Sequence, residues 1–343
     1  MLGAVFRVKR YLYAIVLLLL VHVAVAQQRP QYTQYVFNNY LLNPAVTGIE
    51  NYTDVKAGYR AQWTGLEGAP VTSYLTINAP IGRQFIESSA NSFGAGGGQN
   101  PYSRSYTQDY MAAAPHHGIG AMVITDKAGP ITQTNAAATY AYHLGLNDRL
   151  NFSVGVAAGF RRMSLNTSEI TLETALDPAI ANGNNVTFQP DLGVGVWLYS
   201  SNYYVGISAQ QILPQSLYIQ SNAINLAKTV PHYFVTAGVK FFLSDDLTLM
   251  PSVLIKQVKP VPLSYDVNLK LGFQDKFWIG TAYRHGDSYS AMAGFYASSF
   301  LNVGYSYDVT TSNLNTVSHG SHELVIGILL NNRYNVTCPR YSF

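Results

Sequence analysis

The chain has few of the features that an enzyme or a disulfide-stabilised domain requires. Only 11% of its 343 residues are charged, and a single cysteine, Cys338, cannot form an intramolecular disulfide. The sequence holds no His-Glu-x-x-His zinc helix, no phosphate-binding Gly-Lys-Ser/Thr loop, no nucleophile elbow and no calcium loop. We therefore expect no enzyme activity, no metal and no cofactor.

Long apolar runs are also missing, except at the N-terminus. Arg7, Lys9 and Arg10 precede the apolar run 11–23, and Ala24-Val25-Ala26 forms a small-x-small cleavage site, so residues 1–26 are predicted to be a signal peptide. The run is shorter than the roughly 20 residues that a membrane-spanning helix needs. Cleavage would lower Lys+Arg from 21 to 18 by removing three cations, which equals the 18 Asp+Glu. A neutral mature chain gives no reason to expect a nucleic-acid partner.

What the chain does contain is 26 tyrosines, 28 glycines and an alternation of apolar and polar residues with period two. In residues 263–272, Leu263, Tyr265 and Val267 alternate with Ser264, Asp266 and Asn268. A helix would not produce this period, whereas a barrel strand has one row of side chains toward lipid and the other toward the lumen. The alternation predicts an outer-membrane protein.

The full pattern predicts an all-β fold, a transmembrane antiparallel β-barrel of about fourteen strands over residues 54–331. Most candidate strands have about the ten residues that cross a bilayer at the usual tilt. An irregular segment, 27–53, precedes the barrel and a tail, 332–343, follows it. The candidate strands are 54–63, 70–79, 118–125, 132–143, 150–161, 190–199, 202–210, 231–242, 246–256, 263–272, 276–284, 287–296, 299–309 and 321–331.

Short and long connections alternate from the fourth strand onward, as they do in outer-membrane barrels. With the short connections on the periplasmic side, this alternation predicts that both termini lie in the periplasm. Residues 80–117 break the rule, because they would form a long periplasmic connection with either a hidden strand or a flexible Gly-rich insert. Segment 27–53 is too irregular for a strand, and we expect it either beneath the barrel or as a plug in its lumen.

Charged and imidazole side chains are the remaining candidates for chemistry. The inward positions Asp191, Lys240, Asp266, Lys270 and Asp308 are compatible with an aqueous pore or with a lumenal salt-bridge network. His116 and His117 point to opposite faces of a strand, so they are not expected to share a metal. A barrel enzyme would need a serine beside one of the histidines at predicted strand ends, which are better explained as solvated or lumen-facing residues. These histidines are His143, His232, His285 and His322.

Blocks along the whole mature chain resemble the PorP/SprF family of type IX secretion system outer-membrane proteins of the Bacteroidota. The order of the blocks carries the resemblance, from Pro30-Gln31-Tyr32-Thr33-Gln34-Tyr35 to the terminal Cys338-Pro339-Arg340. The resemblance marks the following residues as structural or partner-binding: Pro30, Gln31, Tyr32, Gln34, Tyr35, Asn43, Pro44, Gly48, Tyr59, Arg60, Gln62, Trp63, Asp126, Gly129, His322, Glu323, Cys338 and Pro339.

The resemblance implies a non-enzymatic outer-membrane component of the type IX protein secretion machinery, and of gliding in some members. Its implied partners are the periplasmic ring lipoprotein complex, a secreted adhesin with a C-terminal signal domain, or both, and the barrel would help to export the adhesin or anchor it at the cell surface. The other interpretation is a porin-like or hydrophobic-solute channel with the same fold.

Overall fold

The computed structural model describes residues 31–82, 85, 110–169, 186–214, 229–274 and 276–332. The predicted signal peptide, Pro30, Cys338 and Pro339 lie outside the described residues, as does most of the stretch 80–117. Within the described ranges, no helix is long and apolar enough to cross a bilayer.

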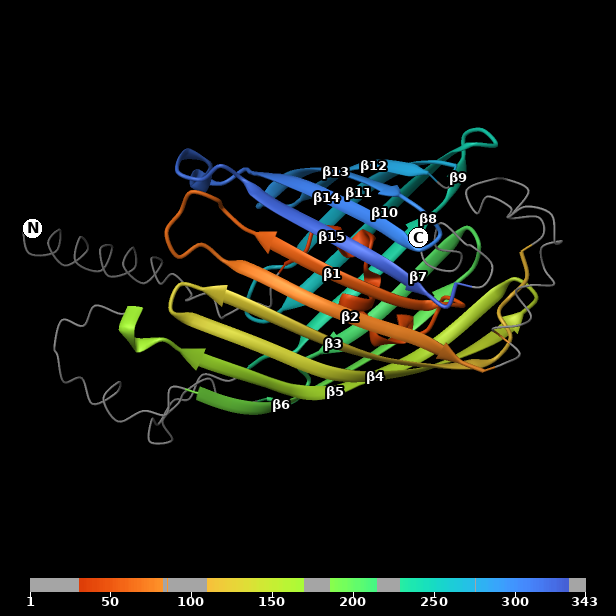
Figure 1. Cartoon of the computed structure of the whole chain (residues 1–343), viewed down its shortest axis with the longest axis horizontal. Coiled ribbons are helices and arrows are strands. Elements are labelled where there is room, and N and C mark those ends of the chain that lie inside the picture. The colour runs from red at the N-terminus through yellow and green to blue at the C-terminus, as the bar shows by residue number, and fades with distance from the viewer. Residues whose placement is uncertain are drawn as a thin grey trace, which may run out of the picture.

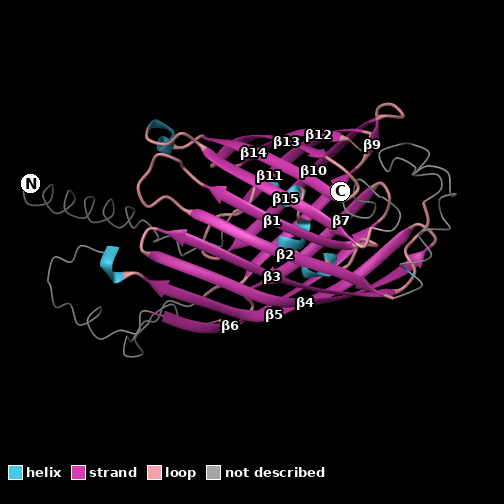
Figure 2. Ribbon diagram, in the orientation of Figure 1, coloured by secondary structure: helices cyan, strands magenta, loops and turns pink. Residues whose placement is uncertain are grey.

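Strands form one closed antiparallel sheet (Figures 1 and 2), so the prediction of an all-β barrel is confirmed. The ring closes where β15 pairs with β1, with Tyr59 opposite Leu324. The short segment β9 pairs with β10 beside β8 and is separated from β8 by Lys240 alone, so the fifteen strand segments make fourteen barrel strands. Their bounds are β1 Thr53–Ala61, β2 Val71–Ile81, β3 His116–Ala128, β4 Ile131–Asn147, β5 Leu150–Leu165, β6 Val186–Tyr199, β7 Tyr203–Gln210, β8 His232–Val239, β9 Phe241–Phe242, β10 Leu247–Val258, β11 Ser264–Phe273, β12 Phe277–Arg284, β13 Ser288–Tyr296, β14 Leu301–Thr310 and β15 Ser321–Leu330.

The two faces of the wall differ as the alternation predicts. In β11, Val267 and Leu269 are exposed on the outside, whereas Asp266, Asn268 and Lys270 are buried on the inside. Aromatic side chains stand on the outside at both ends of the barrel, as Tyr289 and Phe295 do at opposite ends of β13. This arrangement matches the apolar band and the two aromatic girdles of an outer-membrane barrel.

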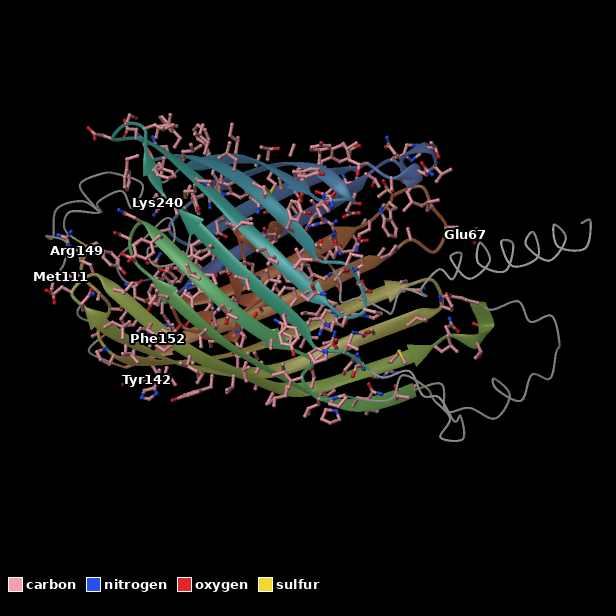
Figure 3. All side chains as sticks on the ribbon, turned by 180° about the vertical axis from the view of Figure 1, so that it is seen from behind. Glu67, Met111, Tyr142, Arg149, Phe152 and Lys240 are labelled. Carbon is pink, nitrogen blue, oxygen red and sulfur yellow. The ribbon has the colours of Figure 1, made fainter. Side chains whose placement is uncertain are left out.

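The barrel has two mouths that differ in their connections. The loop mouth carries connection 62–70 and the described residues 166–169, 211–214 and 229–231, and it lies on the left in Figure 1. The turn mouth carries 148–149 and 200–202, together with the starts of β1 and β3 and the ends of β2 and β15. Figure 3 shows Glu67 at the loop mouth and Arg149 at the turn mouth.

Residues 32–52, which we call the lumenal plug, fill the inside of the barrel. Every one of them is buried. Three short 3₁₀ turns, Gln34–Val36, Asn39–Leu41 and Pro44–Val46, fold the segment compactly. The last turn begins with Pro44 at its first position, and the Oδ1 of Asn43 accepts the N–H of Ala45 at 2.9 Å. Proline and an asparagine cap favour such a turn over a strand.

The plug runs the length of the lumen before β1 begins. At the loop mouth, the N–H of Thr33 donates to Glu323 at the start of β15. At the turn mouth, the N–H of Gly48 donates to Asn78 near the end of β2. An even number of strands brings the start of β1 and the end of β15 to one mouth, but the plug carries Gln31 to the other. Gln31 and Asn332, the first and last described residues, therefore lie at opposite mouths of the barrel.

Candidate functional site

At the loop mouth the plug is held by a charge cluster, defined as Arg60, Asp308 and Glu323. The guanidinium of Arg60 lies 2.7 Å from Asp308 and 3.1 Å from Glu323, and all three side chains are almost fully buried. Thr33 completes the cluster, because its hydroxyl donates to Asp308 at 2.8 Å and its N–H donates to Glu323 at 2.7 Å. Buried carboxylates require such partners, so the plug supplies hydrogen bonds that help to stabilise the buried charges of the wall.

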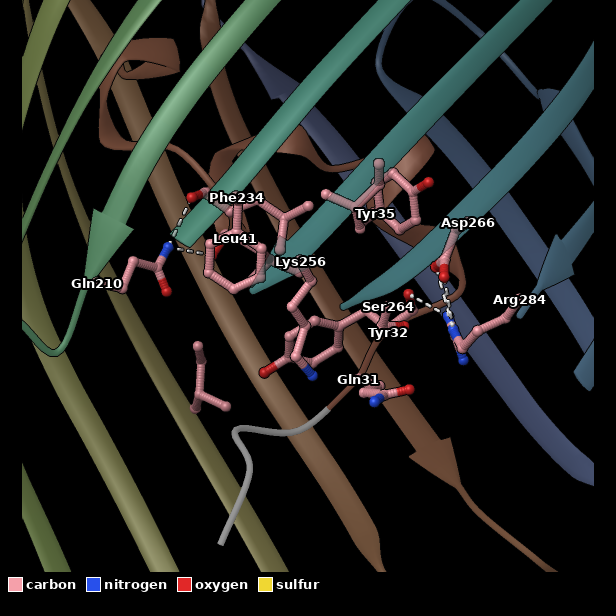
Figure 4. Close-up of a pocket in the computed structure, with 13 residues that line it drawn as sticks. Gln31, Tyr32, Tyr35, Leu41, Gln210, Phe234, Lys256, Ser264, Asp266 and Arg284 are labelled. Atoms are coloured by element: carbon pink, nitrogen blue, oxygen red, sulfur yellow. Dashed lines mark hydrogen bonds and ion pairs between the residues drawn. The ribbon is translucent and has the colours of Figure 1, made fainter. Parts of the chain in front are cut away.

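A second ion pair lies beside this cluster. Arg284 of β12 contacts Asp266 of β11 at 3.1 Å and donates to the carbonyl of Tyr32 at 3.3 Å (Figure 4). Its guanidinium also lies 3.2 Å from Asp287. The ammonium of Lys270 lies 5.2 Å above the ring of Trp278. Asp266 and Asp308 therefore belong to a lumenal salt-bridge network, as one of the two interpretations of the sequence predicted, and they do not line an open pore.

The middle of the plug is bound by neutral hydrogen bonds. The amide of Asn43 donates to the carbonyls of Val196 and Ile207 on β6 and β7. The hydroxyl of Tyr40 lies 2.6 Å from that of Thr139 on β4. These bonds satisfy polar groups that would otherwise be buried without partners.

Near the turn mouth, the plug lies directly against glycines of the wall. A Cβ on Gly118 would lie 1.9 Å from the carbonyl oxygen of Thr47, and one on Gly155 would lie 2.4 Å from Pro44 and Ala45. Gly48 itself has φ of +71°, a conformation that side chains rarely adopt. Glycine is therefore needed on both sides of this contact.

Two histidines close the turn-mouth end of the plug. Ring nitrogens of His143 and His116 lie 2.9 and 3.1 Å from the carbonyl oxygens of Thr47 and Gly48. The two rings stack at 4.5 Å, and Phe85 stacks on His116 at 3.6 Å. The strand-end histidine His143 is thus a plug contact. Within the described residues, no three His, Cys, Asp or Glu side chains are placed to hold a metal.

Little space remains between the plug and the wall. A pocket beside Tyr35, Leu41 and Phe234 (Figure 4) has a volume of about 30 Å³, and a second one beside Tyr40 and Pro44 has about the same. A volume of this size has room for about one water molecule. The lumen is packed at the level of the plug.

The structure gathers most of the motif residues around the plug and the loop mouth. Tyr32, Gln34, Tyr35, Asn43, Pro44 and Gly48 are buried in the plug, Gln31 is half-buried, and Arg60 and Glu323 meet at Thr33. Gln62, Trp63, Asp126 and Gly129 lie at the loop mouth, where Trp63 donates to Ser321 and Gly129 donates to Gly68.

Two motif residues lie apart from this group, on the outer face. Tyr59 is 54% exposed, and His322 accepts or donates a 2.7 Å hydrogen bond with the hydroxyl of Tyr305. No contact joins them to the plug among the described residues, and a position in the aromatic girdle explains both.

Several wall residues that hold the plug were not marked as site residues from the sequence. Among them are Gly118, Gly155 and Ser153, whose hydroxyl donates to the carbonyl of Ala45 at 2.7 Å. One signal was present. In β5 the inward positions 155, 157 and 159 are Gly, Ala and Gly, which indicates that something approaches the wall closely.

The family model for the type IX secretion system membrane protein PorP/SprF matches residues 24–328. The chain belongs to this family. It is therefore an outer-membrane barrel of the type IX secretion system, as the resemblance in the sequence implied. No curated protein sequence matches this member of the PorP/SprF family.

Solved barrels of similar architecture include the Ralstonia pickettii toluene transporter TbuX, with TM-score 0.48 and 11% identity over 84% of this chain and 92% of that one. The monoaromatic hydrocarbon channel CymD has TM-score 0.48 and 12% identity over 89% and 94% of the two chains. Outer membrane protein Omp33 of Acinetobacter baumannii has TM-score 0.45 and 8% identity over 83% and 100%. At these identities, what they transport is not assigned to this PorP/SprF protein.

Proposed function

We propose that this PorP/SprF protein serves type IX secretion by binding protein partners at its two mouths and not by conducting solutes through its lumen. Its partners are the periplasmic ring lipoprotein complex, a secreted adhesin with a C-terminal signal domain, or both. In the second case it exports the adhesin or anchors it at the cell surface. Some family members would serve gliding in the same way.

The observation that carries this proposal is the packed lumen. All residues from 32 to 52 are buried, and the pockets beside them have volumes of about 30 Å³. A solute channel needs a continuous path through the barrel, and an unfolded polypeptide needs a wider one. The plug is buried and hence unavailable as a periplasmic dock, so partners would bind the connections at the mouths.

The orientation of the barrel follows from its connections in this proposal. Outer-membrane barrels have short turns toward the periplasm and longer loops outside. The turn mouth would then face the periplasm and meet the ring, and the loop mouth would face the cell surface and meet the adhesin. The end of β15 would then face the periplasm.

An affinity pull-down from the native envelope tests the partners. The detergent-solubilised barrel would be captured and the co-purifying chains identified by mass spectrometry. Recovery of ring lipoproteins would make it a core component, and recovery of one large adhesin would make it a dedicated cargo partner. Recovery of neither would contradict the proposal.

The channel interpretation is tested on the same purified protein in planar bilayers. The packed lumen predicts no steady ion conductance above the bilayer background. A steady conductance of porin size would instead support a porin-like or hydrophobic-solute channel, and the proposal would then be abandoned even if partners co-purify.

A further inference from the structure

The path of the plug relative to β1 shows in which direction the plug crosses the lumen. Thr33 and Arg60 are 27 residues apart in sequence, yet the guanidinium of Arg60 donates to the hydroxyl of Thr33 at 3.1 Å. Between them the chain passes Gly48, which is bonded to Asn78 at the opposite mouth. The plug therefore descends from the loop mouth to the turn mouth, and β1 returns along the wall.

From this path we infer that the loop-mouth end of the plug, at Gln31, is accessible from the cell surface, on the opposite side of the membrane from the end of β15. The inference rests on the orientation in the proposed function, in which the loop mouth faces outward. It differs from the expectation that both termini are periplasmic, which counted strands and did not include a segment that crosses the lumen.

The attachments at the two ends of the plug determine how it could move. Its turn-mouth end continues directly into β1, which is paired with β15 from Thr53 to Ala61 and with β2 from Asp54 to Ala61. Its other described end lies at the loop mouth, where Thr33 is held by Asp308 and Glu323. A partner at the loop mouth would therefore compete with the contacts of Thr33, whereas a partner at the turn mouth would have to unpair β1 to move the plug.

Cysteine labelling in whole cells tests this inference. In a Cys338→Ser background, which removes the single native cysteine, Gln31→Cys would be compared with Glu67→Cys and Arg149→Cys. Glu67 is exposed at the loop mouth and Arg149 is exposed at the turn mouth, so they are the matched references (Figure 3). A membrane-impermeant maleimide would be added to intact and to permeabilised cells, and heat-modifiable gel migration would verify that each barrel is folded.

We expect Gln31→Cys and Glu67→Cys to label in intact cells, and Arg149→Cys to label only after permeabilisation. A Gln31→Cys variant that labels only in permeabilised cells, like Arg149→Cys, would overturn the inference. Labelling of Arg149→Cys alone in intact cells would overturn it too, because the barrel would then be inserted the other way. If the labelling is as expected but the pull-down recovers no partner, the proposed function is contradicted and the inference about Gln31 is still supported.

Discussion

The two ends of the lumenal plug are held by different physical means. At the loop mouth, Thr33 is bound by the charge cluster of Arg60, Asp308 and Glu323. At the turn mouth, Thr47 and Gly48 touch the backbone of Gly118, and their carbonyl oxygens are hydrogen-bonded to the rings of His143 and His116. One end depends on charge balance and the other on the absence of side-chain volume, so different substitutions should loosen each end.

Removing the one cation of the charge cluster should have the largest effect. Arg60→Met leaves Asp308 and Glu323 buried without their guanidinium, and breaking a buried ion pair in this way costs about 3–5 kcal/mol. Urea unfolding of the protein in detergent, followed by the fluorescence of the buried Trp197 and Trp278, would measure the loss. Adding Glu323→Gln to Arg60→Met should restore part of the stability. An unchanged unfolding midpoint in Arg60→Met would show that the cluster does not hold the plug.

Adding volume at the turn mouth should have the next largest effect. Gly118→Val would bring a side chain against the carbonyl of Thr47, and overpacking of this kind costs about 1–3 kcal/mol or more. Ala121→Val is the matched control, because Ala121 lies on the lipid-facing side of the same strand. In urea unfolding, Gly118→Val should have a lower midpoint than Ala121→Val. Equal midpoints would contradict the close contact between Gly118 and Thr47.

A neutral contact in the middle of the plug should matter less. Asn43→Ala removes both the cap of the Pro44–Val46 turn and the donors to Val196 and Ile207, which together should cost about 1–2 kcal/mol. Asn43→Ser keeps an oxygen for the cap and should fall between the wild type and Asn43→Ala in urea unfolding. If Asn43→Ala matched the wild type, neither contact would contribute.

An ion pair outside the lumen should show the smallest effect. Lys127 and Glu169 lie 3.2 Å apart, and their side chains are 56% and 41% exposed. Exposed pairs of this kind contribute up to about 1 kcal/mol and weaken with added salt. Lys127→Ala should therefore shift the unfolding midpoint far less than Arg60→Met. An equal loss of stability in Lys127→Ala and Arg60→Met would mean that burial does not make the charge cluster more important than the exposed ion pair.

The wall could be predicted closely from the sequence. A strand was expected over 263–272 and the structure has Ser264–Phe273, and one was expected over 150–161 where it has Leu150–Leu165. Strand alternation is a local property, because each residue faces either lipid or lumen regardless of what lies across the barrel. The gap at Lys240 between β8 and β9 was the one interruption that the pattern did not indicate.

The contents of the lumen could be predicted only in outline. The order of motif blocks marked Arg60, Glu323 and several plug residues together, but nothing in their spacing showed that Arg60 would meet Thr33 and Glu323. These contacts join residues 27 and 263 positions apart. Irregular segments have no period from which a path can be derived.

The sequence by itself thus determined the barrel, its membrane and its family, because period-two alternation and family motifs are written along the chain. Only the tertiary structure decided that residues 32–52 cross the lumen, that Asp266 and Asp308 belong to ion pairs, and that Gln31 and Asn332 lie at opposite mouths. The physical reason is that buried polar groups must find partners wherever the closed wall supplies them, and closure brings together residues from both ends of the chain.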